Sequence, residues 1–209
     1  MKKEILAASV LAVLFLTLSS VGLAGDDPED NAFSRSVALE YKGKYKEALE
    51  ELAQVSPDLK FAYVTHLRRG WLNYNLGKYT DAITEYTSAI AKERGSVEAQ
   101  VGIIAPQLAL RRWVDAEKSA KAALKLDPKN YLAQSKLAYA YFNLTRFHES
   151  EKLYLDILKR YPSDLEMRSG YAWSLFKQGK YQEAKKEFRK VLAVAPKYAT
   201  ALQGIKLCP

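Results

Sequence analysis

A pattern of apolar residues recurs along this chain every 34 residues, with no insertion between copies. In the clearest copy, residues 165–198, apolar side chains at three- and four-residue steps predict two amphipathic helices that meet at Gly179. Glycine accepts the backbone conformation that ends many helices, and Pro196 disfavours helical geometry in the residue before it. Stacked copies bury their apolar faces against their neighbours, so the spacing predicts an array of helices and not a single globular core. The residues that take the place of Gly179 in the earlier copies are Thr145, Arg111, Gly77 and Gly43.

The pattern resembles the tetratricopeptide repeat family, whose unit is a helix–turn–helix of 34 residues. The resemblance rests on Tyr181, Ala184 and Pro196 and on their counterparts in the earlier copies. It implies an all-α fold, a right-handed superhelical solenoid of about five repeats with a short C-terminal helix. The implied boundaries are residues 29–62, 63–96, 97–130, 131–164 and 165–198 for the repeats and 199–209 for the C-terminal capping helix.

Two repeats depart from the family pattern. In the first, Arg35 and Ser36 stand where apolar residues are expected, and Pro57 should shorten the second helix. This repeat is therefore interpreted as the polar cap that ends a repeat stack. In the third, Pro106 lies inside the first helix, where its ring meets the carbonyl of Gly102 and one hydrogen bond is lost. We expect a kink there and not a break, because the register continues on both sides.

Residues 1–24 have the features of a secretory signal peptide, which leaves residues 25–209 for the repeat domain. Lys2 and Lys3 precede an apolar run, and small residues precede a predicted cleavage site ahead of Gly25. The alternative is an uncleaved membrane anchor, because the uncharged stretch is just long enough to span a bilayer. We therefore expect a periplasmic or secreted protein, with an N-terminally anchored form as the alternative.

Charge is distributed unevenly along the chain. The formal net charge is +8, and it divides into −4 for residues 25–62, +4 for 63–130 and +7 for 131–209, with the rest in the leader. Such a field can steer an acidic partner. An exported protein rarely meets nucleic acid, so we expect no nucleic-acid partner. The single cysteine, Cys208, cannot form an internal disulfide, and it is interpreted as a free tail thiol or an intermolecular link.

No catalytic or metal-binding pattern is visible in the sequence. His66 and His148 fall in different repeats, without a neighbouring cysteine or carboxylate at metal-ligand spacing. There is no glycine-rich phosphate loop and no nucleophile motif. We therefore expect no enzymatic activity and no cofactor.

The resemblance also implies a binding surface. In the family, the ninth, twelfth and thirteenth residues of each unit point into the concave groove. Aromatic side chains there offer large contact area at low entropic cost, and asparagine can bond to the backbone of a partner. The alternative for the twelfth position is packing alone, because family members often carry an aromatic residue there for that purpose. The predicted partner-binding residues are Trp71, Tyr74, Asn75, Leu108, Tyr139, Phe142, Asn143, Trp173, Phe176 and Lys177.

These observations predict a non-catalytic interaction or assembly module of the cell envelope that binds a partner protein or peptide in its concave groove. The alternative is a polysaccharide-binding or export-associated module that stacks sugar rings on the groove aromatics. The leader makes a membrane-proximal site compatible with either. A further alternative that the sequence leaves open is that the chain is the helical front part of a longer export protein. Neither the identity of the partner nor the biological process follows from the sequence.

Overall fold

The structure is a computed structural model, and it describes residues 28–55 and 61–209. The predicted signal peptide and Pro57 lie outside the described residues. All regular secondary structure in the described ranges is helical. The helices are α2 (Pro28–Tyr41), α3 (Tyr45–Leu52), α4 (Ala62–Asn75), α5 (Tyr79–Lys92), α6 (Val97–Gly102), α7 (Ile104–Ala109), α8 (Trp113–Leu126), α9 (Tyr131–Asn143), α10 (Phe147–Arg160), α11 (Leu165–Lys177), α12 (Tyr181–Val194) and α13 (Ala199–Leu207).

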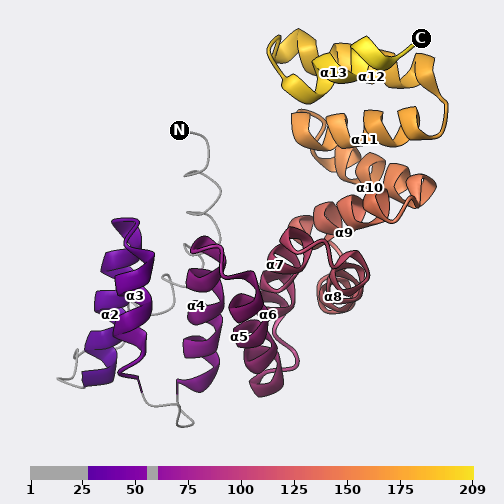
Figure 1. Ribbon diagram of the computed structural model, residues 1–209. Helices are drawn as coiled ribbons and strands as arrows, with labels where there is room; N and C mark the ends of the chain where they lie inside the picture. The colour runs from indigo at the N-terminus through magenta and orange to yellow at the C-terminus, as the bar shows by residue number, and fades with distance from the viewer. Residues whose placement is uncertain (1–27, 56–60) are drawn as a thin grey trace.

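The helices stack one after another into an elongated, curved array that runs from α2 at one end to α13 at the other (Figure 1). Each helix packs mainly against its neighbours in the sequence, and the apolar core is accordingly divided into clusters along the array. This arrangement confirms the predicted all-α solenoid. No helix in the described ranges is long and apolar enough to cross a membrane.

The turn between the two helices of a repeat has the same geometry throughout. Its central residue has a positive φ in every copy, between 57° at Arg111 and 78° at Gly179. Glycine adopts this conformation without strain, whereas Arg111 and the β-branched Thr145 do so against their intrinsic preference. The second helix begins two residues later, each time with an aromatic residue: Tyr45, Tyr79, Trp113, Phe147 and Tyr181.

Successive repeats are held together by rings that pack on glycine. A Cβ at Gly170 would lie 2.5 Å from Cζ of Tyr154, and a Cβ at Gly204 would lie 2.3 Å from Cε2 of Phe188. Gly102 has the same relation to Tyr86, at 2.4 Å from Cε1. These distances are far below van der Waals contact, so only glycine allows the neighbouring helix to approach this closely.

At the junction between the third and fourth repeats the small and the large residue have exchanged places. Ala120 takes the place of the ring and Lys136 takes the place of the glycine. Burial lowers the pKa of the Lys136 ammonium. At this junction the long aliphatic side chain of Lys136 therefore replaces the aromatic ring of the other junctions, and it comes from the opposite helix.

The first and third repeats show the local deviations that the sequence indicates. The helix α3 has 8 residues, against 14 in α5. Ser36 is fully buried, and its hydroxyl accepts a hydrogen bond from Arg68 at 3.3 Å. Near Pro106, α6 and α7 are separated by Ile103 alone, which keeps helical dihedrals of −66° and −22°. The missing proline N–H therefore kinks the helix without breaking its direction, as expected.

The helix α13 covers the last repeat. Its Ala201 is buried against α11 and α12, together with Cys208 directly after the helix. Burial raises the pKa of the Cys208 thiol. The thiol therefore packs as a small apolar group at the end of the core.

Candidate functional site

The predicted groove residues lie on α4, α7, α9 and α11, the first helices of successive repeats. Four of them, from two neighbouring repeats, line one pocket of about 280 Å³. The helix α9 contributes Tyr139 and Phe142, and α11 contributes Trp173 and Lys177. The structure thus brings together side chains that are more than thirty residues apart in the sequence.

The aromatic residues of this pocket pack against other rings. The Trp173 ring packs edge-on against Phe176 and Phe188, each with a centroid distance of 5.3 Å. Tyr139 packs edge-on against Trp113 at 6.0 Å and is still 47% exposed. The pocket therefore has one wall that packs on neighbouring rings and one accessible aromatic face.

Tyr154 and Gly170 complete the lining of the pocket. Tyr154 comes from α10, a second helix, so the family pattern of groove positions does not include it. Burial raises the pKa of its hydroxyl, which stays protonated at neutral pH. The sequence feature that could have indicated Tyr154 is the pairing of an aromatic residue in one repeat with a glycine, Gly170, in the next.

Lys177 supplies the charge at this site. Its side chain is exposed, and within residues 28–55 and 61–209 it makes no ion pair. A free ammonium beside an apolar pocket can bind a carboxylate or a carbonyl oxygen of a partner. Lys177 therefore places a positive charge at the edge of an apolar pocket.

Trp71 lies apart from this pocket and has a different environment. Its Nε1–H donates to a carboxylate oxygen of Glu40 at 2.7 Å, and the other oxygen of Glu40 accepts from Arg68 at 2.9 Å. Trp71 also packs on the cluster around Leu72. These contacts tie α4 to α2, so Trp71 has a structural role in joining the first two repeats.

The other predicted residues take part in packing and in hydrogen bonds within the stack, and Phe142 does so in addition to lining the pocket. Asn75 and Asn143 each donate one amide N–H to the carbonyl four residues earlier, at 2.8 and 2.9 Å. Leu108 packs on the core cluster of the third and fourth repeats. At the twelfth position, the aromatic ring meets the ring that begins the second helix, with centroid distances of 5.8, 5.4 and 5.3 Å. These pairs are Tyr74–Tyr79, Phe142–Phe147 and Phe176–Tyr181.

The two histidines have no metal-binding environment in the described part of the chain, where no cluster of potential metal ligands occurs. Nδ1 of His66 lies 2.7 Å from Oε2 of Glu85, and His148 is exposed. His66 thus links α4 to α5.

Together, the stacked helix pairs define a helical-repeat protein, and the aromatic pocket lies between two of its repeats. Tetratricopeptide repeat models match residues 67–131, 107–174 and 169–198. The chain therefore belongs to the tetratricopeptide repeat family. The family's fold is a protein–protein interaction module, and its members are generally non-catalytic scaffolds. No curated protein matches the chain in sequence.

Several solved structures share the fold. The MamA 41-end chain from Desulfovibrio magneticus RS-1 is 18% identical, over 84% of this chain and 99% of that one, with a TM-score of 0.77. A tetratricopeptide repeat protein from Parabacteroides merdae is 19% identical over 85% of this chain and 71% of that one, also with a TM-score of 0.77. YrrB, described as having an unusual peptide-binding site, is 13% identical over 84% and 91% of the two chains, with a TM-score of 0.74. At these identities the likeness concerns the fold alone.

Proposed function

We propose that this chain is a non-catalytic assembly module of the cell envelope that binds a segment of a partner protein at the pocket between α9 and α11. The proposal rests on one observation: a single apolar pocket is lined by Tyr139, Phe142, Trp173 and Lys177. The peptide-binding site described for YrrB, a protein of the same fold, is consistent with it.

The chemistry of the pocket indicates what the partner presents. Its volume of about 280 Å³ is at the small end of ligand pockets and suits one large apolar side chain. Lys177 at its edge favours an acidic residue or a backbone carbonyl next to that side chain. The partner segment is therefore expected to combine an apolar anchor with a neighbouring acceptor.

A protein ligand is favoured over a polysaccharide by the state of the rings. Stacking of sugars requires open ring faces along the groove. Among the predicted groove aromatics, Tyr139 is exposed, whereas Trp71, Phe142 and Trp173 are partly buried in contacts with other side chains. One open ring serves as an anchor point for a side chain more readily than as a ladder.

The envelope location rests on the leader, residues 1–24, with its basic start and apolar run. An exported repeat module that has no catalytic pattern suits the assembly of other envelope proteins. This part of the proposal is independent of the pocket, and it is tested by the N-terminal sequence of the exported protein.

The pocket is tested by replacing Tyr139, whose exposure makes its loss tolerable for folding. The partner is first recovered by cross-linking and pull-down from envelope extract, and its affinity for purified variants is then measured. Loss of an aromatic anchor typically costs about 2 kcal/mol or more, so Tyr139→Ala should weaken binding by a factor of about 30. Lys177→Glu should weaken it as well, chiefly if the partner segment is acidic.

Tyr161→Ala is the matched control. Tyr161 is 44% exposed, a fraction similar to the 47% of Tyr139, and it does not line the pocket. Its replacement should leave affinity unchanged, with circular dichroism verifying the helical content of each variant. Equal effects of the two tyrosine replacements, or normal binding by Tyr139→Ala, would contradict the proposed site.

A further inference from the structure

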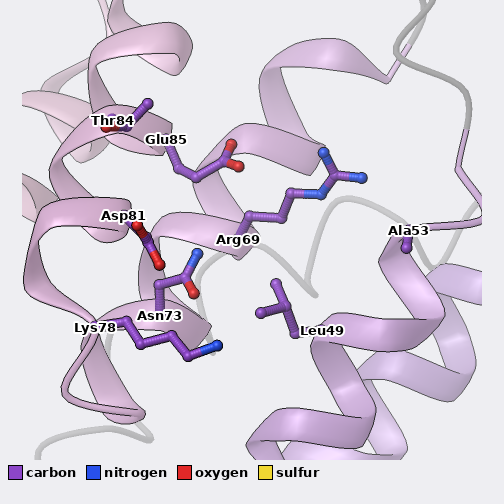
Figure 2. Close-up of a pocket in the computed structure, with 8 residues that line it drawn as sticks. All are labelled: Leu49, Ala53, Arg69, Asn73, Lys78, Asp81, Thr84 and Glu85. Carbon is purple, nitrogen blue, oxygen red and sulfur yellow. The ribbon is translucent and has the colours of Figure 1, made fainter.

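A second pocket lies away from the predicted groove, where α3, α4 and α5 meet. We call it the outer cleft; it encloses about 480 Å³. On α4 its lining residue Asn73 is rotated by about 160° from Trp71, so the two residues face opposite sides of the helix. The cleft is lined by Leu49, Ala53, Arg69, Asn73, Lys78, Asp81, Thr84 and Glu85 (Figure 2).

The corresponding place two repeats later is filled by the protein's own side chains. Glu117 accepts hydrogen bonds from Lys121 at 2.6 Å and from Arg146 at 2.8 Å. The guanidinium of Arg146 also lies over the ring of Tyr141, at 4.2 Å from its centroid, and pairs with Glu149 at 2.7 Å. A carboxylate bound by a cation thus closes this junction from within.

The outer cleft is open because these residues are replaced in the first two repeats. Leu49 stands in place of Glu117, Ala53 in place of Lys121, and Asn73 in place of Tyr141. Lys78 has the position of Arg146 and retains its positive charge. The substitutions therefore remove the internal carboxylate and the bulk, but they keep the cation that would bind the carboxylate.

Within the described ranges, Lys78 and its first-repeat counterpart Lys44 make no ion pair, in contrast to the residues at this position in the later repeats. Arg112 pairs with Asp115 at 2.7 Å, and Lys180 pairs with Glu151 at 2.9 Å. Within the described ranges, the ammonium of Lys78 makes neither an ion pair nor a hydrogen bond, although Asp81 stands three residues later in the same helix. Figure 2 shows the Lys78 side chain extending below the Asn73 amide toward Leu49.

Asn73 provides a second free polar group in the cleft. The residue is only 5% exposed, and its side-chain amide makes no hydrogen bond in the part of the chain that the structure describes. Although the residue is largely buried, its amide atoms reach the solvent of the cleft, so they are available to hydrogen-bond a ligand there. Arg69 stabilises the wall beside it by donating from Nη2 to the carbonyl of Leu52 at 2.8 Å.

We propose that the outer cleft binds a carboxylate of a partner peptide, which takes the place that Glu117 has two repeats later. The Lys78 ammonium supplies the charge and the Asn73 amide supplies a neutral donor, while Leu49 and Ala53 contact the aliphatic part of the ligand. The carboxylate belongs to an aspartate or glutamate side chain or to a chain terminus.

Two carboxylates of α5, the helix that Lys78 caps, limit the choice of ligand. Asp81 lies on the same side of the cleft as Lys78, and Glu85 lies one turn further along, where His66 pairs with it at 2.7 Å (Figure 2). These carboxylates repel a ligand with several adjacent negative charges. The cleft therefore selects a single carboxylate flanked by neutral or basic residues, and it disfavours acidic runs and nucleic acids.

The proposal is tested by nuclear magnetic resonance on the 15N-labelled protein with three short probe peptides. One is a blocked tripeptide with a central glutamate, one has glutamine instead, and one has a neutral sequence with a free C-terminal carboxylate. Saturable shifts of the Asn73 side-chain amide signals by a carboxylate probe, and not by the glutamine probe, are the expected result. The glutamate and C-terminal probes distinguish the two sources of the carboxylate.

Leu49→Glu is the decisive variant, because it restores the internal carboxylate beside Lys78. It should weaken probe binding by about tenfold or more, as expected for competition for a charged hydrogen bond. Leu49 also packs on the core cluster around Leu52, so circular dichroism must show that the variant is folded at the temperature of the titration. Leu49→Met keeps the wall apolar and should bind the probe as the unmodified protein does. Tyr139→Ala should leave the outer cleft unaffected, which separates this result from that for the groove.

Three results would overturn the proposal. The first is the absence of shifts at Asn73 with either carboxylate probe at about 10 mM, where even a millimolar Kd would give near-saturation. The second is equal binding by Leu49→Glu and Leu49→Met. The third is a response to the glutamine probe equal to that for glutamate.

Discussion

Replacement of Gly170 by alanine tests how tightly the repeats are joined. The new Cβ would lie 2.5 Å from Cζ and 2.7 Å from Cε1 of Tyr154. Nonbonded carbons prefer about 3.5–4.0 Å, so the ring would have to move by about 1 Å. The ring has little freedom to do so, because Tyr154 is 5% exposed and packs with Ala138, Ile157 and Met167.

The expected loss follows from two opposing effects. Overpacking of a buried contact costs about 1–3 kcal/mol, whereas alanine favours a helix over glycine by up to about 1 kcal/mol. The net result is a destabilisation of about 1–2 kcal/mol, which lowers the melting temperature by about 2–8 °C for a chain of this size. Urea unfolding followed by circular dichroism measures it.

Gly95→Ala is the control for this prediction. A Cβ at Gly95 meets no atom within 4 Å, so the change should stay within about 0.5 kcal/mol of zero. In a Tyr154→Leu background the ring is absent, and Gly170→Ala should then cost markedly less than in the unmodified protein. Unaltered stability of Gly170→Ala, or an equal cost with and without the ring, would refute the ring-on-glycine contact as the reason.

Four further predictions concern other parts of the chain. Ala184 is fully buried, so Ala184→Leu should destabilise the protein by about 1–3 kcal/mol, and an unchanged melting temperature would contradict the assigned helix packing. Thr145→Gly should increase the free energy of unfolding by about 0.5–1 kcal/mol and so raise the urea midpoint, because it relieves a φ of 60° at a β-branched residue. Glu117→Gln should cost about 1 kcal/mol at neutral pH and nothing in strong acid, as melting temperatures across pH would show. N-terminal sequencing of the exported protein should begin near Gly25, and recovery of a membrane-bound form that retains Lys2 would disprove cleavage.

The pH dependence of the Glu117 effect has a definite sign. Burial tends to raise the pKa of Glu117, but hydrogen bonds from Lys121 and Arg146 outweigh it and hold the pKa below its ordinary value of 4.5. The stability from these bonds is therefore complete above pH 4.5 and is lost as pH falls through the lowered pKa. A difference between Glu117→Gln and the unmodified protein that grew on acidification would contradict this account.

The sequence by itself determined the helices and the turns between them. These features depend on residues within one repeat, where apolar spacing and turn residues act locally and recur often enough to be recognised. The 34-residue register aligns Arg111 and Thr145 with Gly179, and in the structure both adopt the left-handed turn conformation although neither residue favours it. The kink at Pro106 likewise follows from the chemistry of one residue.

The tertiary structure decided which of the predicted groove residues lie together. By sequence position, Trp71, Tyr139 and Trp173 are equivalent. In the structure Trp71 is bonded to Glu40, whereas Tyr139 and Trp173 line a common pocket with Tyr154. The difference arises from side chains of the neighbouring repeats, which a pattern of equivalent positions within one repeat does not describe.

The outer cleft depended on the tertiary structure for the same reason. Leu49, Asn73 and Lys78 are unremarkable residues in three different helical segments, and none belongs to a recognisable motif. Their significance appears only when the three segments meet and leave a space that Glu117, Tyr141 and Arg146 fill elsewhere. Local periodicity specifies where each helix begins and ends, but the volumes and charges of side chains from three helices decide whether their junction is closed or open.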